Sequence, residues 1–225
     1  IGSTGSFAIS NNKIQVKQET NYPWDGKVQI SVIPEKQTEF DLCIRIPGWA
    51  VNQPVPGDTY RYLDKSSETV SLILNGMPAT YKVVNGYAVI RKLWKKGDIV
   101  MLDLPMPVQK IVAINEVKDN RNRVALQRGP LVYCFEHPDN NGKAMNIVIP
   151  DNTSFTAEFK PDLLSGVVEL SSDAIVVNIS GNGLSASTEK KRVSAIPFFS
   201  WANRGEGQMQ VWMPRKIADV RLLSE

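Results

Sequence analysis

The chain has 225 residues, of which 42% are hydrophobic and 22% charged, values that exclude a disordered chain and are ordinary for a globular protein. Its 26 basic and 23 acidic residues give a net charge of +3 and are interspersed along the sequence, which argues against a nucleic-acid-binding surface. No apolar run approaches the roughly 20 residues that a membrane-spanning helix needs.

Hydrophobic residues alternate with polar ones along most of the chain, and this period of two predicts β-strands. In residues 27–33 (KVQISVI), Val28, Ile30 and Val32 alternate with polar residues, and residues 40–46 (FDLCIRI) follow the same pattern. Further segments of this kind follow in chain order at 71–76, 87–94, 98–104, 123–129, 131–136, 174–179 and 208–213. No segment has a sustained helical period. The sequence therefore predicts an all-β fold with two consecutive antiparallel β-sandwich domains of jelly-roll-like type.

Turn residues separate these predicted strands. The Asn-Gly pairs at 75–76 and 85–86 and the sequence Lys96-Gly97-Asp98 predict tight turns, because Asn and Gly tolerate positive φ. Trp24 in NYPWDG and Trp49 in RIPGWA lie beside proline-containing turns at strand ends, and we expect them to close the ends of the first domain's core.

A domain boundary is predicted around residues 104–108 (LPMPV). Pro105 and Pro107 would each remove a hydrogen-bond donor from a strand that continued through them. We therefore expect a first domain over residues 1–106 and a second over residues 107–225.

The residues with reactive side chains give little sign of catalysis. Cys43 and Cys134 are the two cysteines, and each lies in an apolar run, as buried unpaired thiols do. They lack the spacing of a zinc motif, and the single histidine, His137, lies in the turn-forming string EHPDNNG, which predicts a solvated loop histidine. The strings PDNNG and PDNTS supply oxygen atoms of the kind that bind calcium, but their spacing matches no EF-hand loop. We expect no catalytic residue and no metal ligand in this chain.

Residues 196–214 (IPFFSWANRGEGQMQVWMP) gather several aromatic side chains around one Asn-Arg-Gly turn. In an extended chain adjacent side chains project to opposite faces, so Met209, Val211 and Met213 are expected on one face and Trp212 on the other. The guanidinium of the turn's arginine is expected to pair with a carboxylate or with backbone carbonyls and so to fix a hairpin. The candidate residues for contact with another domain or with a sugar are Phe198, Phe199, Trp201, Asn203, Arg204 and Trp212.

Five strings together resemble a known protein family, and they span nearly the whole chain. They are residues 18–32 (QETNYPWDGKVQISV), 42–50 (LCIRIPGWA), 86–106 (GYAVIRKLWKKGDIVMLDLPM), 124–136 (VALQRGPLVYCFE) and 196–214. In content and in order they closely resemble glycoside hydrolase family 127, the family of β-L-arabinofuranosidases.

The resemblance implies an N-terminal (α/α)6 barrel that carries the active site, followed by two β-sandwich domains to which all five strings belong. It also implies that the family's zinc ion, its cysteine nucleophile and its glutamate general acid lie on the barrel. Neither Cys43 nor Cys134 falls in that zinc and nucleophile motif, so no cofactor is expected in this chain. The implied protein is the non-catalytic C-terminal part of a β-L-arabinofuranosidase-like enzyme of plant-type glycan degradation.

Three roles follow for such a region. The leading hypothesis is an accessory pair of sandwiches that packs against the barrel of the same polypeptide and supports it. The alternative is a carbohydrate-binding module whose exposed aromatic rings stack on arabinose-containing glycans, and the third is a partner-binding or oligomerisation domain. Co-planar, solvent-facing rings would favour the sugar, whereas rings of mixed orientation in a broad apolar patch would favour packing. No nucleic-acid or membrane partner is expected.

Overall fold

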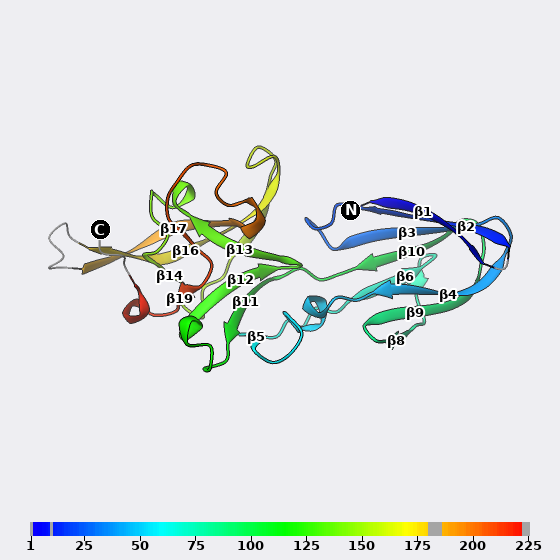
Figure 1. Ribbon diagram of the computed structural model, residues 1–225, viewed down its shortest axis with the longest axis horizontal. Coiled ribbons are helices and arrows are strands. Elements are labelled where there is room, and N and C mark those ends of the chain that lie inside the picture. Colours follow the sequence, from blue (N-terminus) through cyan, green and yellow to red (C-terminus); the bar gives the residue numbers. More distant parts are fainter. Residues whose placement is uncertain (1, 10, 180–185, 222–225) are drawn as a thin grey trace. The chain divides into compact units, whose positions relative to one another are not determined.

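A computed structural model of the chain describes residues 2–9, 11–179 and 186–221. The chain folds into two compact units (Figure 1). Unit 1 contains Ile1–Gln53 and Ser67–Met106, and unit 2 contains Pro54–Ser66 and Pro107–Glu225. The described elements are strands and short 3-10 helices, which confirms the predicted all-β class. None of the described segments forms a helix that is both long and apolar enough to span a membrane.

Unit 1 is a sandwich of two antiparallel sheets. The six-stranded sheet has the order β1 (Ser3–Ile9), β2 (Asn12–Thr20), β3 (Lys27–Pro34), β10 (Asp98–Asp103), β6 (Ser71–Leu74) and β7 (Met77–Pro78). The three-stranded sheet has the order β4 (Thr38–Arg45), β9 (Tyr87–Trp94) and β8 (Lys82–Val84). Ile14 and Val32 from the first sheet and Ile90 and Trp94 from the second belong to one buried core. The two sheets therefore share the inward side chains that the alternating pattern predicts.

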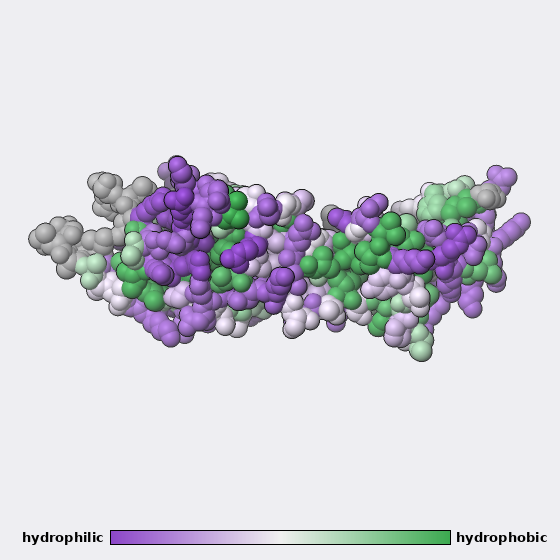
Figure 2. Space-filling view, turned by 90° about the horizontal axis from the view of Figure 1, so that it is seen from below, coloured by the Kyte–Doolittle hydropathy of each residue, from purple (hydrophilic) through white to green (hydrophobic). Residues whose placement is uncertain are grey.

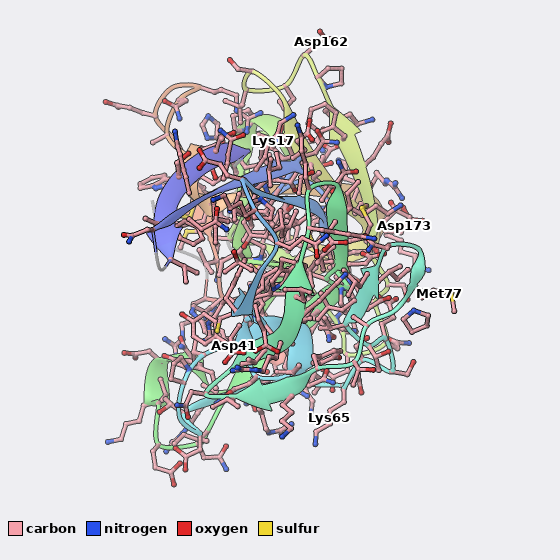
Figure 3. The ribbon with its side chains drawn as sticks, turned by 90° about the vertical axis from the view of Figure 1, so that its right-hand side faces the viewer. Lys17, Asp41, Lys65, Met77, Asp162 and Asp173 are labelled. Carbon is pink, nitrogen blue, oxygen red and sulfur yellow. The ribbon has the colours of Figure 1, made fainter. Side chains whose placement is uncertain are left out.

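Two predicted turns of unit 1 have the backbone that a type I′ hairpin requires. Asn75 and Gly76 between β6 and β7 have φ values of 51° and 83°, and Asn85 and Gly86 between β8 and β9 have values of 51° and 78°. Met77, which follows the first of these turns, projects from the β6–β7 hairpin and is 69% exposed (Figure 3). The Asn-Gly pairs thus set the register of these two hairpins.

Cys43 and Cys134 occupy different environments. Cys134 is fully buried on β13 (Leu131–Glu136) of unit 2, as expected from its apolar run, and both thiols are free. The expectation was wrong for Cys43, which is exposed on β4. The period of two explains the difference, because Leu42 and Ile44 point toward the core and leave Cys43 on the outward face with Asp41 and Arg45.

Trp49 lies in the 3-10 helix η1 (Gly48–Val51) and packs, partly buried, against the core of unit 1. Trp24 is half-buried in the turn that precedes β3, outside the core cluster of the described residues.

The exposed surface of unit 1 is also partly apolar, and the face shown in Figure 2 has more hydrophobic surface on unit 1, at the right, than on unit 2.

Unit 2 is built around one ten-stranded antiparallel sheet. Its main path is β14 (Ile147–Val148), β16 (Val167–Ile179), β17 (Ala186–Pro197), β13 (Leu131–Glu136), β12 (Arg123–Arg128), β11 (Val108–Ala113) and β5 (Tyr60–Tyr62). Three further strands pair beside this path: β15 (Thr156–Lys160) with β16, β18 (Met209–Gln210) with β13, and β19 (Met213–Pro214) with β12. Consecutive residues of β12 and of β13 are buried, so both faces of these central strands are covered.

Strand β5 comes from the first half of the sequence, yet it pairs with β11 of unit 2, with Tyr62 opposite Ile111. Pro54–Ser66 therefore belong to unit 2, so a single cut after Met106 does not separate the two units. The strands on either side of Pro105 and Pro107 belong to different units, since β10 lies in unit 1 and β11 in unit 2.

Candidate interaction site

The aromatic stretch begins where β17 ends in unit 2. Pro197 is the last residue of β17, and Phe198–Ser200 form the 3-10 helix η4 instead of continuing the strand. Ser200 Oγ donates a hydrogen bond to the Pro197 carbonyl at 2.7 Å, which closes this tight turn. The extended hairpin expected from alternation is therefore not formed, because the chain turns before the aromatic side chains can alternate.

Phe198, Phe199 and Trp201 are all exposed, at 41%, 63% and 42%. The rings of Phe198 and Trp201 stack on each other with centroids 6.2 Å apart and planes inclined by only 12°. These two rings, called the Phe198–Trp201 pair below, therefore form an exposed aromatic stack on unit 2.

The loop that follows is held by Arg204, which pairs with carboxylates as the sequence predicted. Its Nη1 donates to Asp139 Oδ1 at 2.7 Å, and its Nη2 donates to Asp139 Oδ2 at 2.6 Å and also to Glu136. The second oxygen of Glu136 accepts the backbone N–H of Ala202 at 2.7 Å. These hydrogen bonds, with that to Asp139 the strongest, raise the pKa of Arg204 above its ordinary value despite partial burial. Arg204 thus fixes the loop to the end of β13 and to the 3-10 helix η3 (His137–Asp139).

Asn203 acts within the loop, where its Nδ2 donates to the Ser200 carbonyl at 3.0 Å. Asn203 and Arg204 therefore hold the loop in place, whereas Phe198, Phe199 and Trp201 form its outer surface.

An open pocket of about 460 Å³ lies beside Trp201 and is lined by His137, Glu206, Gly205, Gly207 and Met209 as well. A Cβ atom on Gly207 would lie 2.2 Å from Nδ1 of His137, so the imidazole rests directly on the glycine backbone. His137 is half-buried and forms part of the pocket wall. Sequence reasoning did not identify Glu206 or Gly207 as site residues, although the glycines of the string Gly-Glu-Gly are typical of a segment where backbone and side chains approach closely.

Trp212 is not part of this surface. Its ring stacks on Tyr60 of β5 with centroids 5.6 Å apart and planes inclined by 29°. Val211 and Trp212 both pack against the buried residues Tyr62 and Ile111. The predicted alternation fails here because β18 and β19 pair with different strands and the chain bends between them at residues 211 and 212.

The described residues do not fit a zinc site, since they include no group of three His, Cys, Asp or Glu side chains placed to hold a metal. Cys43 and Cys134 lie in different units, and burial raises the pKa of the Cys134 thiol to about 12, which disfavours a metal-binding thiolate. The lack of a cofactor in this chain stays a prediction.

Sequence comparison assigns each part of the chain to one family. The profile described as "Beta-L-arabinofuranosidase, GH127 middle domain" matches residues 3–106, and that described as "Glycoside hydrolase family 127 C-terminal domain" matches residues 108–214. The chain belongs to glycoside hydrolase family 127. It comprises the middle and C-terminal domains of a β-L-arabinofuranosidase-like protein.

Individual relatives agree with the family assignment. The non-reducing end β-L-arabinofuranosidase of Bifidobacterium longum subsp. longum is 30% identical over 231 residues, which cover 96% of this chain and 32% of the relative. Among solved structures, a GH127 β-arabinofuranosidase matches with a TM-score of 0.92 and 33% identity, over 98% of this chain and 34% of its own. A GH127 β-L-arabinofuranosidase from Geobacillus stearothermophilus T6 matches with a TM-score of 0.83 and 38% identity, over 96% and 33%. The chain thus spans about a third of the length of these GH127 relatives.

Proposed function

We propose that this chain is the non-catalytic supporting region of a β-L-arabinofuranosidase-like glycosidase, and that it packs against a catalytic domain of the same polypeptide. The observation that carries the proposal is the coverage of its relatives. Proteins named as β-arabinofuranosidases or β-L-arabinofuranosidases match 96% to 98% of this chain, yet the match accounts for only 32% to 34% of their length.

The acidic groups at the candidate site support a structural role for this region. A glycosidase of the usual kind needs two carboxyl groups about 5 to 10 Å apart, one of which donates a proton. Both oxygens of Glu136 are engaged, one by Arg204 and one by the Ala202 N–H, and Asp139 is paired with Arg204 as well. Carboxylates whose oxygens already accept hydrogen bonds from the protein are not free to meet a substrate oxygen, so they suit the fixing of a loop better than acid catalysis.

Unit 1 also has the kind of surface that another domain covers. Val84, Tyr87 and Leu93 are exposed on the outward face of the three-stranded sheet, and Val84 pairs directly with Tyr87. The same face also has the charged side chains of Asp41, Arg45 and Arg91, and such mixed polar and apolar surfaces are typical of contacts between domains.

The test is a chimera with the Geobacillus relative, in which this chain replaces the matching third of that enzyme. We expect the chimera to fold and to hydrolyse an aryl β-L-arabinofuranoside, and we expect the same enzyme without its matching third to lose solubility or thermal stability. The isolated chain should give no hydrolysis above the protein-free background. A truncated relative with unchanged melting temperature and kcat/KM would contradict the supporting role. Turnover by the isolated chain that disappears when one of its own carboxylates is replaced would contradict the non-catalytic role.

A further inference from the structure

We propose that the pocket beside Trp201 is a glycan-binding site of unit 2, which holds one neutral sugar ring against the Phe198–Trp201 pair. The proposal goes beyond the supporting role, because every residue that forms the pocket belongs to unit 2 and the binding needs no catalytic domain.

The first argument is the rigidity of the loop that carries Trp201. Arg204 binds both Asp139 and the buried Glu136, and Glu136 in turn accepts the Ala202 N–H. Asn140, which follows η3, donates to the carbonyl of Ser194 at 2.9 Å and accepts the N–H of the same residue at 3.0 Å. The loop that contains Trp201 and the η3 segment that contains His137 both line the pocket, and both are therefore attached to the sheet. A surface loop fixed in this way loses little conformational entropy when a ligand binds, which favours a binding role.

The second argument is the free hydrogen-bonding capacity of the pocket. Within the described part of the chain, neither the His137 imidazole nor the Glu206 carboxylate has a hydrogen-bond or ion-pair partner. The carboxylate oxygens of Glu206 accept hydrogen bonds, and the imidazole both donates and accepts them. Sugar hydroxyl groups are donors and acceptors in equal measure, so they match both side chains.

The third argument is the aromatic surface at the edge of the pocket. The Phe198 ring stacks on the Trp201 ring with planes only 12° apart, and both side chains are exposed, so the stack holds the Trp201 ring in one orientation where it lines the pocket. The C–H groups on one face of a sugar ring pack against such a surface, while its hydroxyl groups point to the rim. The stack differs from a co-planar pair of rings, because Phe198 and Trp201 face each other, so the sugar would cover the remaining face of the Trp201 ring.

Charge and size favour a neutral sugar over other ligands. Glu206 would repel an anion, and the guanidinium of Arg204 is already occupied by two carboxylates. The pocket volume of about 460 Å³ is in the range of small-molecule sites. A docked protein domain would bury the Glu206 carboxylate and the His137 imidazole, and it would have to supply a hydrogen-bond partner for each. The hydroxyl groups of a single sugar ring supply such partners themselves.

The experiment is a calorimetric and tryptophan-fluorescence titration of the folded chain with short arabinan oligosaccharides, with galactan and xylan oligosaccharides in parallel. The choice of arabinan as the first probe rests on the proposed function. We expect saturable binding of at least one of these glycans, and Trp201→Ala should weaken it by about tenfold or more, as for a buried aromatic contact. Glu206→Gln should weaken it less. Gly207→Ala should weaken it too, because the new Cβ would displace the His137 imidazole.

The matched control is Phe7→Ala, which removes an aromatic side chain of similar exposure, 45%, from unit 1. It should leave the affinity unchanged, and circular dichroism should show that each variant is folded. The proposal is overturned if the folded chain binds none of the three glycans, or if Trp201→Ala and Gly207→Ala, both folded, bind with the parent's affinity. Loss of chimera activity in Trp201→Ala without any glycan binding by the chain would instead identify a protein contact, which also overturns it.

The two proposals fail separately. An inactive chimera whose isolated chain binds glycan contradicts the supporting role alone, and an active chimera whose isolated chain binds no glycan contradicts the pocket alone.

Discussion

At the scale of single residues, Asp98 is the buried charge of unit 1 whose partners are most fully defined. Its carboxylate accepts hydrogen bonds from Asn75 Nδ2 at 2.7 Å, Lys92 Nζ at 3.0 Å and the Lys95 N–H at 2.9 Å. Burial by itself raises the pKa of Asp98, but these three donors outweigh burial and hold the pKa below its ordinary value. The ionised carboxylate therefore joins the β9–β10 turn to the β6–β7 hairpin.

We predict that Asp98→Asn lowers the free energy of unfolding by about 2–3 kcal/mol at neutral pH, as expected for hydrogen bonds to a charged group. Because the pKa of Asp98 is lower in the folded state than its unfolded value near 3.9, the stabilisation is complete above that pH and is lost as the pH falls through the folded-state pKa. Urea unfolding followed by circular dichroism should therefore show a difference between parent and variant that shrinks below about pH 4.

Asp103→Asn is the matched control, because Asp103 lies on the same strand β10 and is exposed. Its effect should stay within about 0.5 kcal/mol. Equal losses in the two variants, or a difference that does not depend on pH, would show that the hydrogen bonds of the Asp98 carboxylate do not stabilise the fold in this way.

In unit 2 the corresponding interaction is the pairing of the Arg204 guanidinium with the carboxylates of Glu136 and Asp139. Replacement by Ala leaves Glu136, only 3% exposed, as a buried carboxylate without its cation. We predict a loss of about 3 kcal/mol in the free energy of unfolding for Arg204→Ala, of which the double variant Arg204→Ala with Glu136→Gln recovers a part. A double variant that is less stable than the sum of the single losses would show that the pair acts through packing instead of charge.

At the scale of elements, β5 is a three-residue strand whose attachment depends on side chains from a distant part of the sequence. It is the edge strand of the sheet and pairs with β11, and Tyr60 stacks on Trp212, which lies between β18 and β19. Tyr62 adds a hydrogen bond from its hydroxyl group to Gln127 on β12 at 3.0 Å. A strand of this length has few backbone hydrogen bonds, so its side chains decide whether it stays in the sheet.

We predict that Trp212→Ala detaches β5. The expected loss in stability of unit 2 is about 2–3 kcal/mol, below the value for a fully buried tryptophan because Trp212 is only half-buried. Hydrogen exchange at Leu63, whose N–H donates to the Lys110 carbonyl of β11, and proteolysis within Pro54–Ser66 should become faster. The control is Trp201→Ala, whose exposed ring should cost less than about 1 kcal/mol and leave β5 protected. Unchanged exchange in Trp212→Ala would show that β5 is held by its backbone pairing alone.

At the scale of the whole molecule, the prediction concerns metal. Structural zinc sites need four convergent ligands, and the described residues of this chain bring no such group together. We expect the purified chain to retain less than one zinc ion per molecule after incubation with zinc and gel filtration, measured by elemental analysis. One tightly held zinc ion per chain, lost in Cys43→Ser or Cys134→Ser, would contradict this expectation.

The sequence alone determined the all-β class, the strands β3, β4, β6, β9 and β10 of unit 1, the two Asn-Gly turns and the family. Each of these depends on residues adjacent in the chain or on strings of residues read in order. It also indicated that Arg204 would pair with an acid. Sequence reasoning could not identify Glu136 and Asp139 as the partners, because they lie 65 or more positions away and meet Arg204 only in the folded sheet.

The tertiary structure alone decided which aromatic side chains are exposed. Trp201 and Trp212 look alike in the sequence, yet one stacks on Phe198 at the surface and the other on Tyr60, about 150 positions earlier in the chain. Alternation applies only while a chain stays extended, and the chain turns at Pro197 and bends at Val211 because each segment pairs with a different strand. The different exposure of Cys43 and Cys134 also needed the tertiary structure, since both faces of β13 are covered, whereas the face of β4 that has Cys43 is open to solvent.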